Sequence, residues 1–325
     1  MKALDANTTA SYNTAIGQNN AGANTTGSNN TTVGYDCFYT NTTGHSNVAM
    51  GAGCMANNTT AANNTAVGFN ALNANTTGHS NSALGEGAGE LITTGIKNTC
   101  IGQNAGQRVT TGENNTYLGR EAGYQATTGS HNICIGYMSG ENITTASSSV
   151  NVGKGIDNSD ATEGDQINLG TDIVGHGVQY LKFGSGSTDT ICAFGGTSLS
   201  APSDERYKKD IETSTAGLSF INDLRPVTFN WKNAGDVPSD HRSYIEGSTT
   251  PVMNAKHNHG FIAQEVKTVI DAHSEIKNGF DMWDEDKEGR QRIADGALVP
   301  MLVKAVQELS AQNEALSARI TTLEG

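Results

Sequence analysis

The sequence is short of the residues that build a conventional protein interior. Of its 325 residues, 35% are hydrophobic, 6% are aromatic and 16% are charged. Neutral polar residues, above all Asn, Thr and Ser, make up the difference, together with many glycines. Because charge is also scarce, the composition is not that of a charge-driven disordered chain. It nevertheless gives a single chain little material for a hydrophobic core.

Other absences exclude whole classes of function. Lys and Arg total 20 against 33 Asp and Glu, so the basic face of a nucleic-acid-binding protein is missing. No apolar run reaches the length of a membrane span, and the first residues lack the apolar segment of a secretory signal. The five cysteines are odd in number and show no paired metal spacing. We therefore expect reduced thiols, assembly in a cytoplasm, and no metal, cofactor, nucleic acid or membrane insertion.

Proline and charge divide the chain. No proline precedes Pro202, and both tryptophans follow it. Residues 1–153 hold four basic and seven acidic side chains, whereas residues 203–325 hold 14 and 20. We predict a repeat stalk at 1–153, a β transition and linker at 154–202, and a globular domain at 203–325.

The stalk is a 17-residue repeat without an insertion. Glycine recurs, each time after an apolar residue, at positions 17, 34, 51, 68, 85, 102, 119, 136 and 153. Asn stands four residues before the first eight of these glycines, and a Thr-Thr-Gly or Thr-Thr-Ala triplet keeps the same register. Three residues after each glycine the side chain is usually small, as at Cys37, Cys54 and Ala71. Such a fixed period indicates a solenoid or a stacked array.

A period of 17 residues is too short for a two-helix repeat, and Asn, Thr and Gly are poor helix residues. Each unit is therefore predicted to hold two short strands and two turns. Coils stacked at about 4.8 Å would form a rod of about 40 Å, in which the Asn columns can form hydrogen-bonded ladders.

The thin core bears on the oligomeric state. Each coil offers about two apolar side chains, the one before the glycine and the small one beyond it. Three chains packed about an axis would bury one face of every coil, so we expect a homotrimer. Over residues 7–153 the units resemble the repeats of trimeric phage fibres and of the heads of trimeric autotransporter adhesins. The predicted fold class is mainly β: a trimeric β-solenoid or β-roll followed by a small α+β domain.

Four sequence blocks mark the C-terminal domain, namely residues 203–210, 225–232, 260–266 and 298–309. In this order they resemble the intramolecular chaperone auto-processing domain of phage tailspikes and tail fibres, the endosialidase type. The resemblance implies a domain that trimerises, guides folding of the stalk, and then cuts itself off as a self-cleaving serine endopeptidase. It also implies a virion tail fibre for host attachment. Its partners would be other tail proteins and a host cell-surface receptor or glycan.

The family motif Ser-Asp-x-Arg-x-Lys matches Ser203, Asp204, Arg206 and Lys208. The match implies a Ser203–Lys208 dyad that cleaves the bond between Pro202 and Ser203. A serine hydroxyl becomes a nucleophile when a base removes its proton, and burial favours the neutral form of lysine that such a base requires. Asp204 and Arg206 are expected to orient the site or to form a salt bridge.

Two residues beside the motif bear on the same reaction. Lys209 is a rival base, one residue beyond Lys208. The rigid ring of Pro202 lies next to the bond to be cut and is expected to slow the cleavage.

The last segment, residues 298–325, is predicted to be a short coiled coil. Its apolar residues alternate at spacings of four and three, with Asn313 in the seam: Leu302, Val306, Leu309, Asn313, Leu316, Ile320 and Leu323. A polar residue in the seam fixes the register of a coiled coil at some loss of stability. A monomeric amphipathic helix is the alternative.

The remaining polar clusters are expected to be structural. His257 and His259 lack a third ligand at metal-binding spacing, so a solvated loop is predicted. His45 and His79 occupy equivalent surface positions. Four stalk cysteines are expected to act as small buried hydrophobes: Cys37, Cys54, Cys100 and Cys134. The acidic loop has no complete calcium-binding pattern: Asp281, Asp284, Glu285, Asp286 and Glu288.

Two other functions compete with the tail fibre. A trimeric bacterial surface adhesin would need an export signal and a membrane anchor. A polysaccharide-degrading tailspike would need paired carboxylates, whereas the seven acidic residues of the stalk are spread apart.

Overall fold

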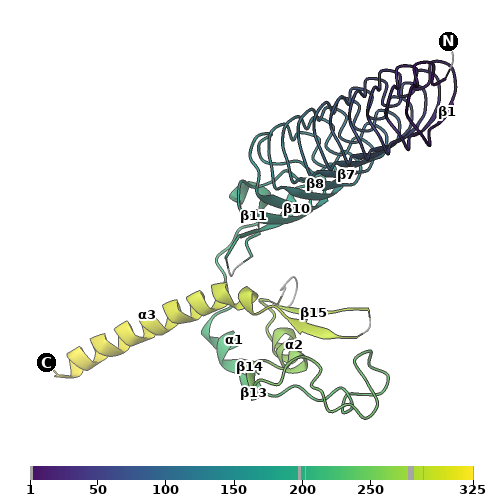
Figure 1. Cartoon of the computed structure of the whole chain (residues 1–325). Coiled ribbons are helices and arrows are strands. Elements are labelled where there is room, and N and C mark those ends of the chain that lie inside the picture. Colours follow the sequence, from purple (N-terminus) through teal and green to yellow (C-terminus); the bar gives the residue numbers. More distant parts are fainter. Residues whose placement is uncertain (1–2, 197–198, 202, 277–281, 288, 325) are drawn as a thin grey trace. The chain divides into compact units, whose positions relative to one another are not determined.

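A computed structural model describes residues 3–196, 199–201, 203–276, 282–287 and 289–324 of the chain. It divides the chain into two compact units, Met1–Tyr207 and Lys208–Gly325. The first unit is a β-solenoid of about ten turns, and the second is a small domain with a long terminal helix (Figure 1). The predicted mainly β fold class is confirmed, and the homotrimer stays a prediction.

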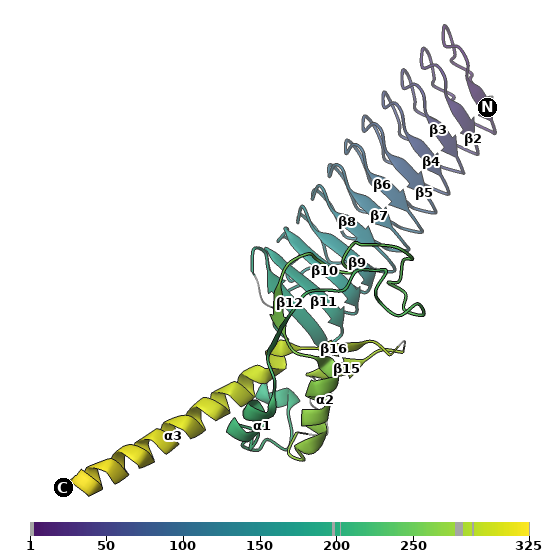
Figure 2. The same cartoon turned by 90° about the horizontal axis from the view of Figure 1, so that it is seen from below.

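The solenoid forms one sheet of 12 strands in sequence order (Figure 2). The first eight strands have three residues each: β1 (Thr14–Ile16), β2 (Thr31–Val33), β3 (Val48–Met50), β4 (Thr65–Val67), β5 (Ser82–Leu84), β6 (Thr99–Ile101), β7 (Thr116–Leu118) and β8 (Ile133–Ile135). They pair in parallel and in repeat register, so that Ala66 lies opposite Ala83. The strands β9 (Val150–Lys154) and β10 (Gln166–Thr171) continue the stack.

The predicted transition segment closes the solenoid. The strand β11 (Tyr180–Ser185) pairs in parallel with β10, and β12 (Thr188–Ala193) then turns back antiparallel to β11. An antiparallel hairpin interrupts the parallel stacking that would otherwise continue at this edge of the sheet.

Each coil contributes one strand, whereas its length and turn residues led us to expect two. The rest of the coil turns through left-handed backbone conformations, as at Asn70 and Leu72. Backbone groups in these turns bond along the stack, for example from Thr59 N to Thr76 O over 3.1 Å. Because the neighbouring coils satisfy the backbone, the turns need no second strand.

The interior differs from the prediction in one respect. The middle residue of each strand points inward, and the apolar residue before the glycine points outward: in β5, Ala83 is buried and Leu84 is exposed. Side chains of a strand alternate between its two faces, which explains the difference. The small residues beyond the glycine, such as Cys54 and Ala88, are buried as predicted.

Buried Asn side chains form the predicted ladders. The Nδ2 of Asn98 donates to the carbonyl of Gly112 over 2.8 Å, and its Oδ1 accepts from the backbone N and the Nδ2 of Asn115 over 3.1 and 3.0 Å. A second column links Asn41 to Asn58 over 2.7 Å. These hydrogen-bonded polar columns stand where a larger domain would place apolar side chains.

The second unit has a conventional mixed core. Its elements are α1 (Leu218–Asp223), β13 (Val227–Phe229), β14 (Asn258–Gly260), α2 (Ala263–Ala272), β15 (Trp283–Glu285), β16 (Gln291–Ile293), η2 (Asp295–Leu298) and α3 (Val299–Glu324). The short helix η1 (Glu205–Tyr207) ends the first unit. Phe220 of α1 packs with Val266 and Ile270 of α2 and with Met282 and Leu298. No helix within the described ranges is long and apolar enough to span a membrane.

The helix α3 is anchored at its first half only. Glu308 accepts a hydrogen bond from the backbone N of Leu218 over 2.8 Å and so caps the start of α1. From Leu309 onward every described residue of α3 is exposed. The predicted helix is therefore confirmed, and its pairing with other copies stays a prediction.

Candidate functional site

The predicted catalytic motif lies at the junction of the two units. Ser203 and Asp204 are in coil, η1 begins at Glu205, and Lys208 follows η1. The carboxylate of Asp204 accepts hydrogen bonds from the backbone N of Arg206 at 2.9 Å and from its Nη2 at 2.6 Å. These bonds fold the motif into a tight turn.

The Asp204–Arg206 pair gives both residues a structural role. The hydrogen bonds from the Arg206 guanidinium and backbone hold the pKa of the Asp204 carboxyl below its usual range. Since both side chains are solvent-exposed, the pair contributes little to stability. The sequence left open whether these two residues orient the site or pair, and they pair with each other.

The nucleophile and the base belong to different units. Ser203 lies in Met1–Tyr207 and Lys208 opens Lys208–Gly325, and both are exposed, as is Lys209. The dyad therefore stays a prediction, as does the cleavage position, because Pro202 lies outside the described residues. The choice between Lys208 and Lys209 is likewise open.

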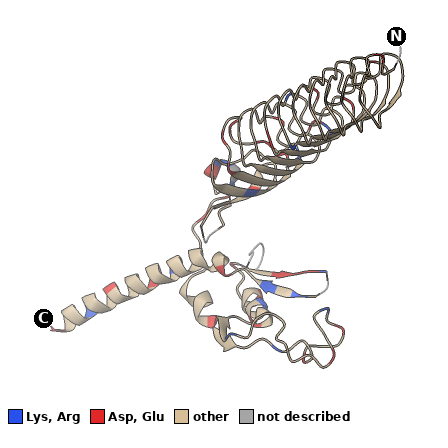
Figure 3. Ribbon diagram, viewed as in Figure 1, with Lys and Arg blue, Asp and Glu red and all other residues tan. Residues whose placement is uncertain are grey.

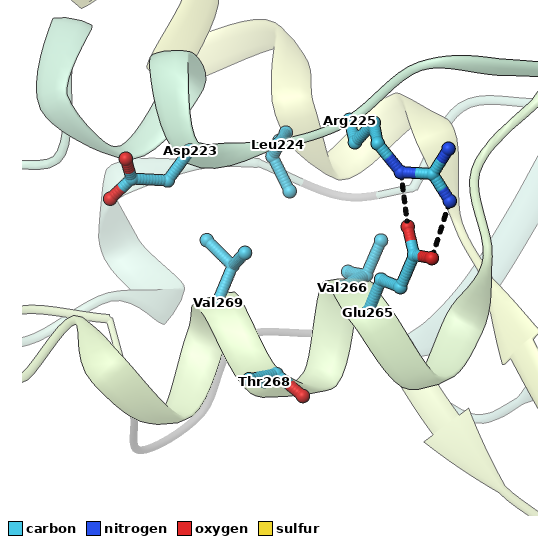
Figure 4. Close-up of a pocket in the computed structure, with 7 residues that line it drawn as sticks. All are labelled: Asp223, Leu224, Arg225, Glu265, Val266, Thr268 and Val269. Carbon is cyan, nitrogen blue, oxygen red and sulfur yellow. Dashed lines mark hydrogen bonds and ion pairs between the residues drawn. The ribbon is translucent and has the colours of Figure 1, made fainter.

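One pocket of the second unit lies between the end of α1 and the face of α2. Leu224, Val266 and Val269 line it. At the rim, Arg225 donates from its Nε and Nη2 to the two carboxylate oxygens of Glu265 (Figure 4). Its volume is about 260 Å³. The polar side chains of the pocket already have partners. Arg225 and Glu265 pair with each other. Asp223 lies 2.9 Å from His273, and the Thr268 hydroxyl donates to the carbonyl of Gln264.

A wider groove of about 840 Å³ borders the hairpin of β13 and β14. Its lining includes Phe229, Trp231, Phe261 and His259. His257 Nδ1 lies 3.1 Å from Asn230 Oδ1, and the rings of His257 and His259 are 6.1 Å apart. Across the described ranges, no group of three or more His, Cys, Asp or Glu side chains could hold a metal ion.

His273 joins two helices through two carboxylates. Its Nδ1 lies 2.9 Å from Glu275 and its Nε2 lies 2.9 Å from Asp223, at the end of α1. The ring also meets Phe220 edge to face at 5.3 Å. Glu275 first, and then Asp223, raise the pKa of His273 above its ordinary value. No sequence motif indicated this cluster.

The stalk cysteines are inert, as predicted. Cys37, Cys54, Cys100 and Cys134 are buried, and all five cysteines of the chain are free thiols. Burial raises the pKa of Cys100 and of Cys134 to about 12, so neither forms the reactive thiolate. His45 and His79 lie on the surface, as expected.

The first and third residues of strands β1 to β9 form an uncharged outer surface, and the third residues form a continuous apolar row, the aliphatic rank. The first of these residues is mostly Thr, Ser or Val, and the third is always aliphatic or Met. The aliphatic rank runs in register from Ile16 through Leu84 to Val152, and none of the positions in either rank of β1 to β9 carries a charge. Figure 3 shows how sparse charge is on the solenoid. The sequence analysis placed these aliphatic side chains in the core. The alternation of side chains within each strand would have placed them on the outer face.

Comparison with known proteins identifies the C-terminal segment. No curated protein and no solved structure matches the chain. Residues 203–275 match the family model Peptidase_S74, chaperone of endosialidase, a family of self-cleaving intramolecular chaperones. A segment similar to the chaperone of endosialidase thus follows a β-solenoid in this chain, an organisation that fits a tail fibre with a C-terminal chaperone domain.

Proposed function

We propose that the protein is a structural phage tail fibre or tailspike that serves host attachment in the virion. Its C-terminal domain assists folding and trimerisation and then removes itself. The family match carries the proposal, because it begins at Ser203, shortly after β12 completes the solenoid. The stalk is then the client of the chaperone, and the C-terminal domain is the part released.

The proposed cleavage uses Ser203 as the nucleophile. Its Oγ attacks the carbonyl carbon of Pro202, the C–N bond to Ser203 breaks, and an ester links Pro202 to the Ser203 oxygen. Lys208 accepts the hydroxyl proton and returns it to the departing amine of Ser203. Water then hydrolyses the ester, which leaves a stalk that ends at Pro202 and a free domain that begins at Ser203.

Assembly of several copies would complete the proposed site. A lysine base must be neutral, and burial favours that form. Lys208 is exposed in the single chain, so the chain alone does not supply this burial. Contacts between copies at the junction would bury it, and cleavage would then follow assembly.

Two unpartnered apolar surfaces support a parallel homo-oligomer. One is the aliphatic rank of the solenoid sheet, and the other is the seam of α3 from Leu309 to Leu323, where each apolar side chain is exposed. In proteins, most of the stability of a helix comes from packing of its amphipathic face. Parallel copies of the same chain would cover both surfaces at once, and the resemblance to trimeric fibres sets the number at three.

The test measures whether the full chain is still cleaved when the proposed nucleophile is removed. Wild-type protein should split near residue 203, and Ser203→Ala should slow this cleavage by about a thousandfold or more, because no other group can attack the same bond. Lys208→Ala should also block cleavage, whereas Lys209→Ala serves as the matched control and should cleave normally. Intact-mass spectrometry reads the cut, and light scattering reads the number of copies.

The possible failures are distinct. Cleavage that persists in Ser203→Ala would refute the dyad. Cleavage that is lost in Lys209→Ala but kept in Lys208→Ala would make Lys209 the base. Uncut wild-type trimers would leave the fibre and chaperone roles standing without the peptidase.

A further inference from the structure

One segment of the second unit stays outside its folded core. Residues 208–215 connect the motif of the proposed dyad to α1, and the structure gives them neither helix nor strand. Every one of these residues is exposed, and within the described ranges no backbone hydrogen bond joins residues 209–215 to another residue. Because protein backbones normally pair their polar groups, this segment is available to pair with another strand.

The same segment has the sequence pattern of a β-strand. β-Branched residues occupy every second position in the run Ile211, Glu212, Thr213, Ser214 and Thr215. Such residues favour strands, and the alternation places them on one face of an extended chain. Ile211 is 63% exposed, so the single chain neither pairs this strand nor covers its large apolar side chain.

The groove beside β13 and β14 offers a place for such a strand. Phe229, Trp231 and Phe261 give it an aromatic lining, and the residues of β16, Gln291–Ile293, also line it. Among the described residues β16 pairs with β15 alone, so its second edge is open. An open strand edge beside apolar pockets is suited to receive an added strand, because main-chain hydrogen bonds give affinity and the pockets give specificity.

The charges of the segment and of the groove complement each other. The side chains of fixed charge that line the groove are Lys232, Arg292 and Asp295. Arg292 already binds Asp286 over 2.8 Å, whereas Lys232 has no ion-pair partner in the part of the chain that the structure describes. Glu212 is exposed and has no such partner there either. A strand that brings Glu212 to Lys232 therefore joins two unpaired charges.

The origin of the segment points to a second copy of the chain as its receiver. The segment ends at Ala216, which is buried, and the backbone N of Leu218 is held by Glu308 of α3 over 2.8 Å. Glu308 directly precedes the exposed part of α3, where neighbouring copies would pack in the proposed oligomer. The segment thus leaves the domain beside the surface that faces those copies. In a ring of three, each copy can give its segment to the next, and this contact closes on itself.

We propose that residues 211–215 of one copy add as a strand to β16 in the groove of a second copy. Ile211 packs against the aromatic lining, and Glu212 pairs with Lys232. The inference rests on the proposed self-cleavage of a trimer and explains how assembly completes the site. Lys208 lies three residues before Ile211, so the contact draws it into the boundary between copies, where burial favours the neutral lysine that the reaction requires.

Cross-linking of the uncleaved Ser203→Ala chain tests the contact. Ile211→Cys and Gln291→Cys place one thiol on the segment and one in the groove, and Cys192→Ser removes the native thiol that is not buried. A short bis-maleimide should join the two positions between copies and give covalent trimers on a denaturing gel. Chains that carry only one of the two introduced cysteines are the controls and should remain single chains on the gel.

Cleavage near residue 203 gives a second measurement in chains that keep Ser203. Ile211→Asn should slow cleavage by about tenfold or more, because a buried amide on the aromatic lining lacks a hydrogen-bond partner. Asn adds no charge near Lys208, and Ile211→Val, which keeps a branched apolar side chain, should cleave nearly as wild type. Ile245→Asn is the matched control: Ile245 lies in the same unit outside the groove and is 62% exposed.

Cross-links confined to single chains would assign the groove to the chain's own segment and overturn the proposal. Covalent products equal to those of the controls would overturn it as well, and so would equal cleavage rates for Ile211→Asn and Ile245→Asn. Light scattering of wild-type protein separates this failure from that of the proposed function. Wild-type trimers that cleave while cross-links fail would leave the proposed function standing without the strand contact, whereas single uncut wild-type chains would refute both.

Discussion

The two units of the chain are stabilised by different kinds of interior. The stalk buries Asn, Ala and Cys in columns that bond from coil to coil, whereas the second unit buries Phe220, Leu224, Ile270 and Met282 in one cluster. A coil of the stalk has little core of its own and depends on its neighbours. The second unit can instead collapse around its own side chains. The difference teaches that folding of the stalk needs a starting point, which the second unit is suited to provide.

Removal of residues 203–325 should have the largest effect on folding of the stalk. In the proposed trimer the C-terminal domain sets the register of the three stalks, and long-range β assemblies are slow to form and prone to aggregate. We expect most of the truncated stalk to be insoluble. The soluble fraction and its circular dichroism measure the effect, with the uncleaved Ser203→Ala chain as the control. Soluble, folded trimers of residues 1–202 would refute the chaperone role.

Gly102→Ala should strongly destabilise the stalk. An added Cβ would lie 2.5 Å from the carbonyl oxygen of Gly119 in the next coil, and φ at this position is +129°. We expect a loss of about 3 kcal/mol or more in the free energy of unfolding, since both strain and clash act on the stack.

Gly22→Ala is the matched control for this change. There the added Cβ would lie 3.7 Å from the ring of Tyr39, an ordinary contact. Thermal melting should show a clearly lower melting temperature for Gly102→Ala than for Gly22→Ala. A melting point of Gly102→Ala within error of wild type would show that the coils do not stack as closely as described.

Asn98→Ala should remove one rung of the polar ladder. The change leaves the carbonyl of Gly112 and the backbone N of Asn115 without their partners inside the stalk. We expect a loss of about 2 kcal/mol in the free energy of unfolding. Asn57→Ala, an exposed position whose amide bonds Asn73 over 3.1 Å, is the control and should change stability by less than about 0.5 kcal/mol. Equal effects would mean that the ladder does not stabilise the stalk.

His273 should make the second unit slightly sensitive to pH. Its pKa is raised in the folded state by Glu275 and Asp223, so its contribution is fully present below the unfolded value of about 6.5. That contribution is lost as pH rises through the folded pKa. We expect the melting temperature of the second unit to fall by a few degrees from pH 6 to pH 8, and His273→Gln to flatten the dependence. If the melting temperature of this variant depends on pH as in wild type, His273 is not the cause of the dependence.

The sequence predicted the periodic features well, because a fixed period constrains the backbone of every coil in the same way. The solenoid, the Asn ladders and the terminal helix could all be predicted from spacing alone. The direction of the residue before each glycine was predicted incorrectly. Ala83 and Leu84 are both apolar, and only the pleat of the strand decides which of them faces inward.

Less of the candidate site could be predicted from the sequence. The motif from Ser203 to Lys208 was found through its resemblance to a family, and the pairing of Asp204 with Arg206 is a local turn that such motifs do not reveal. The His273 cluster joins residues about fifty positions apart, so no local pattern could indicate it.

Native mass spectrometry of the purified wild-type protein tests the central claim most directly, because one spectrum reports both the cut and the number of copies. The account predicts a complex of three stalks, each ending at residue 202, and a separate fragment that begins at Ser203. An intact single chain of 33.9 kDa as the sole species would contradict it.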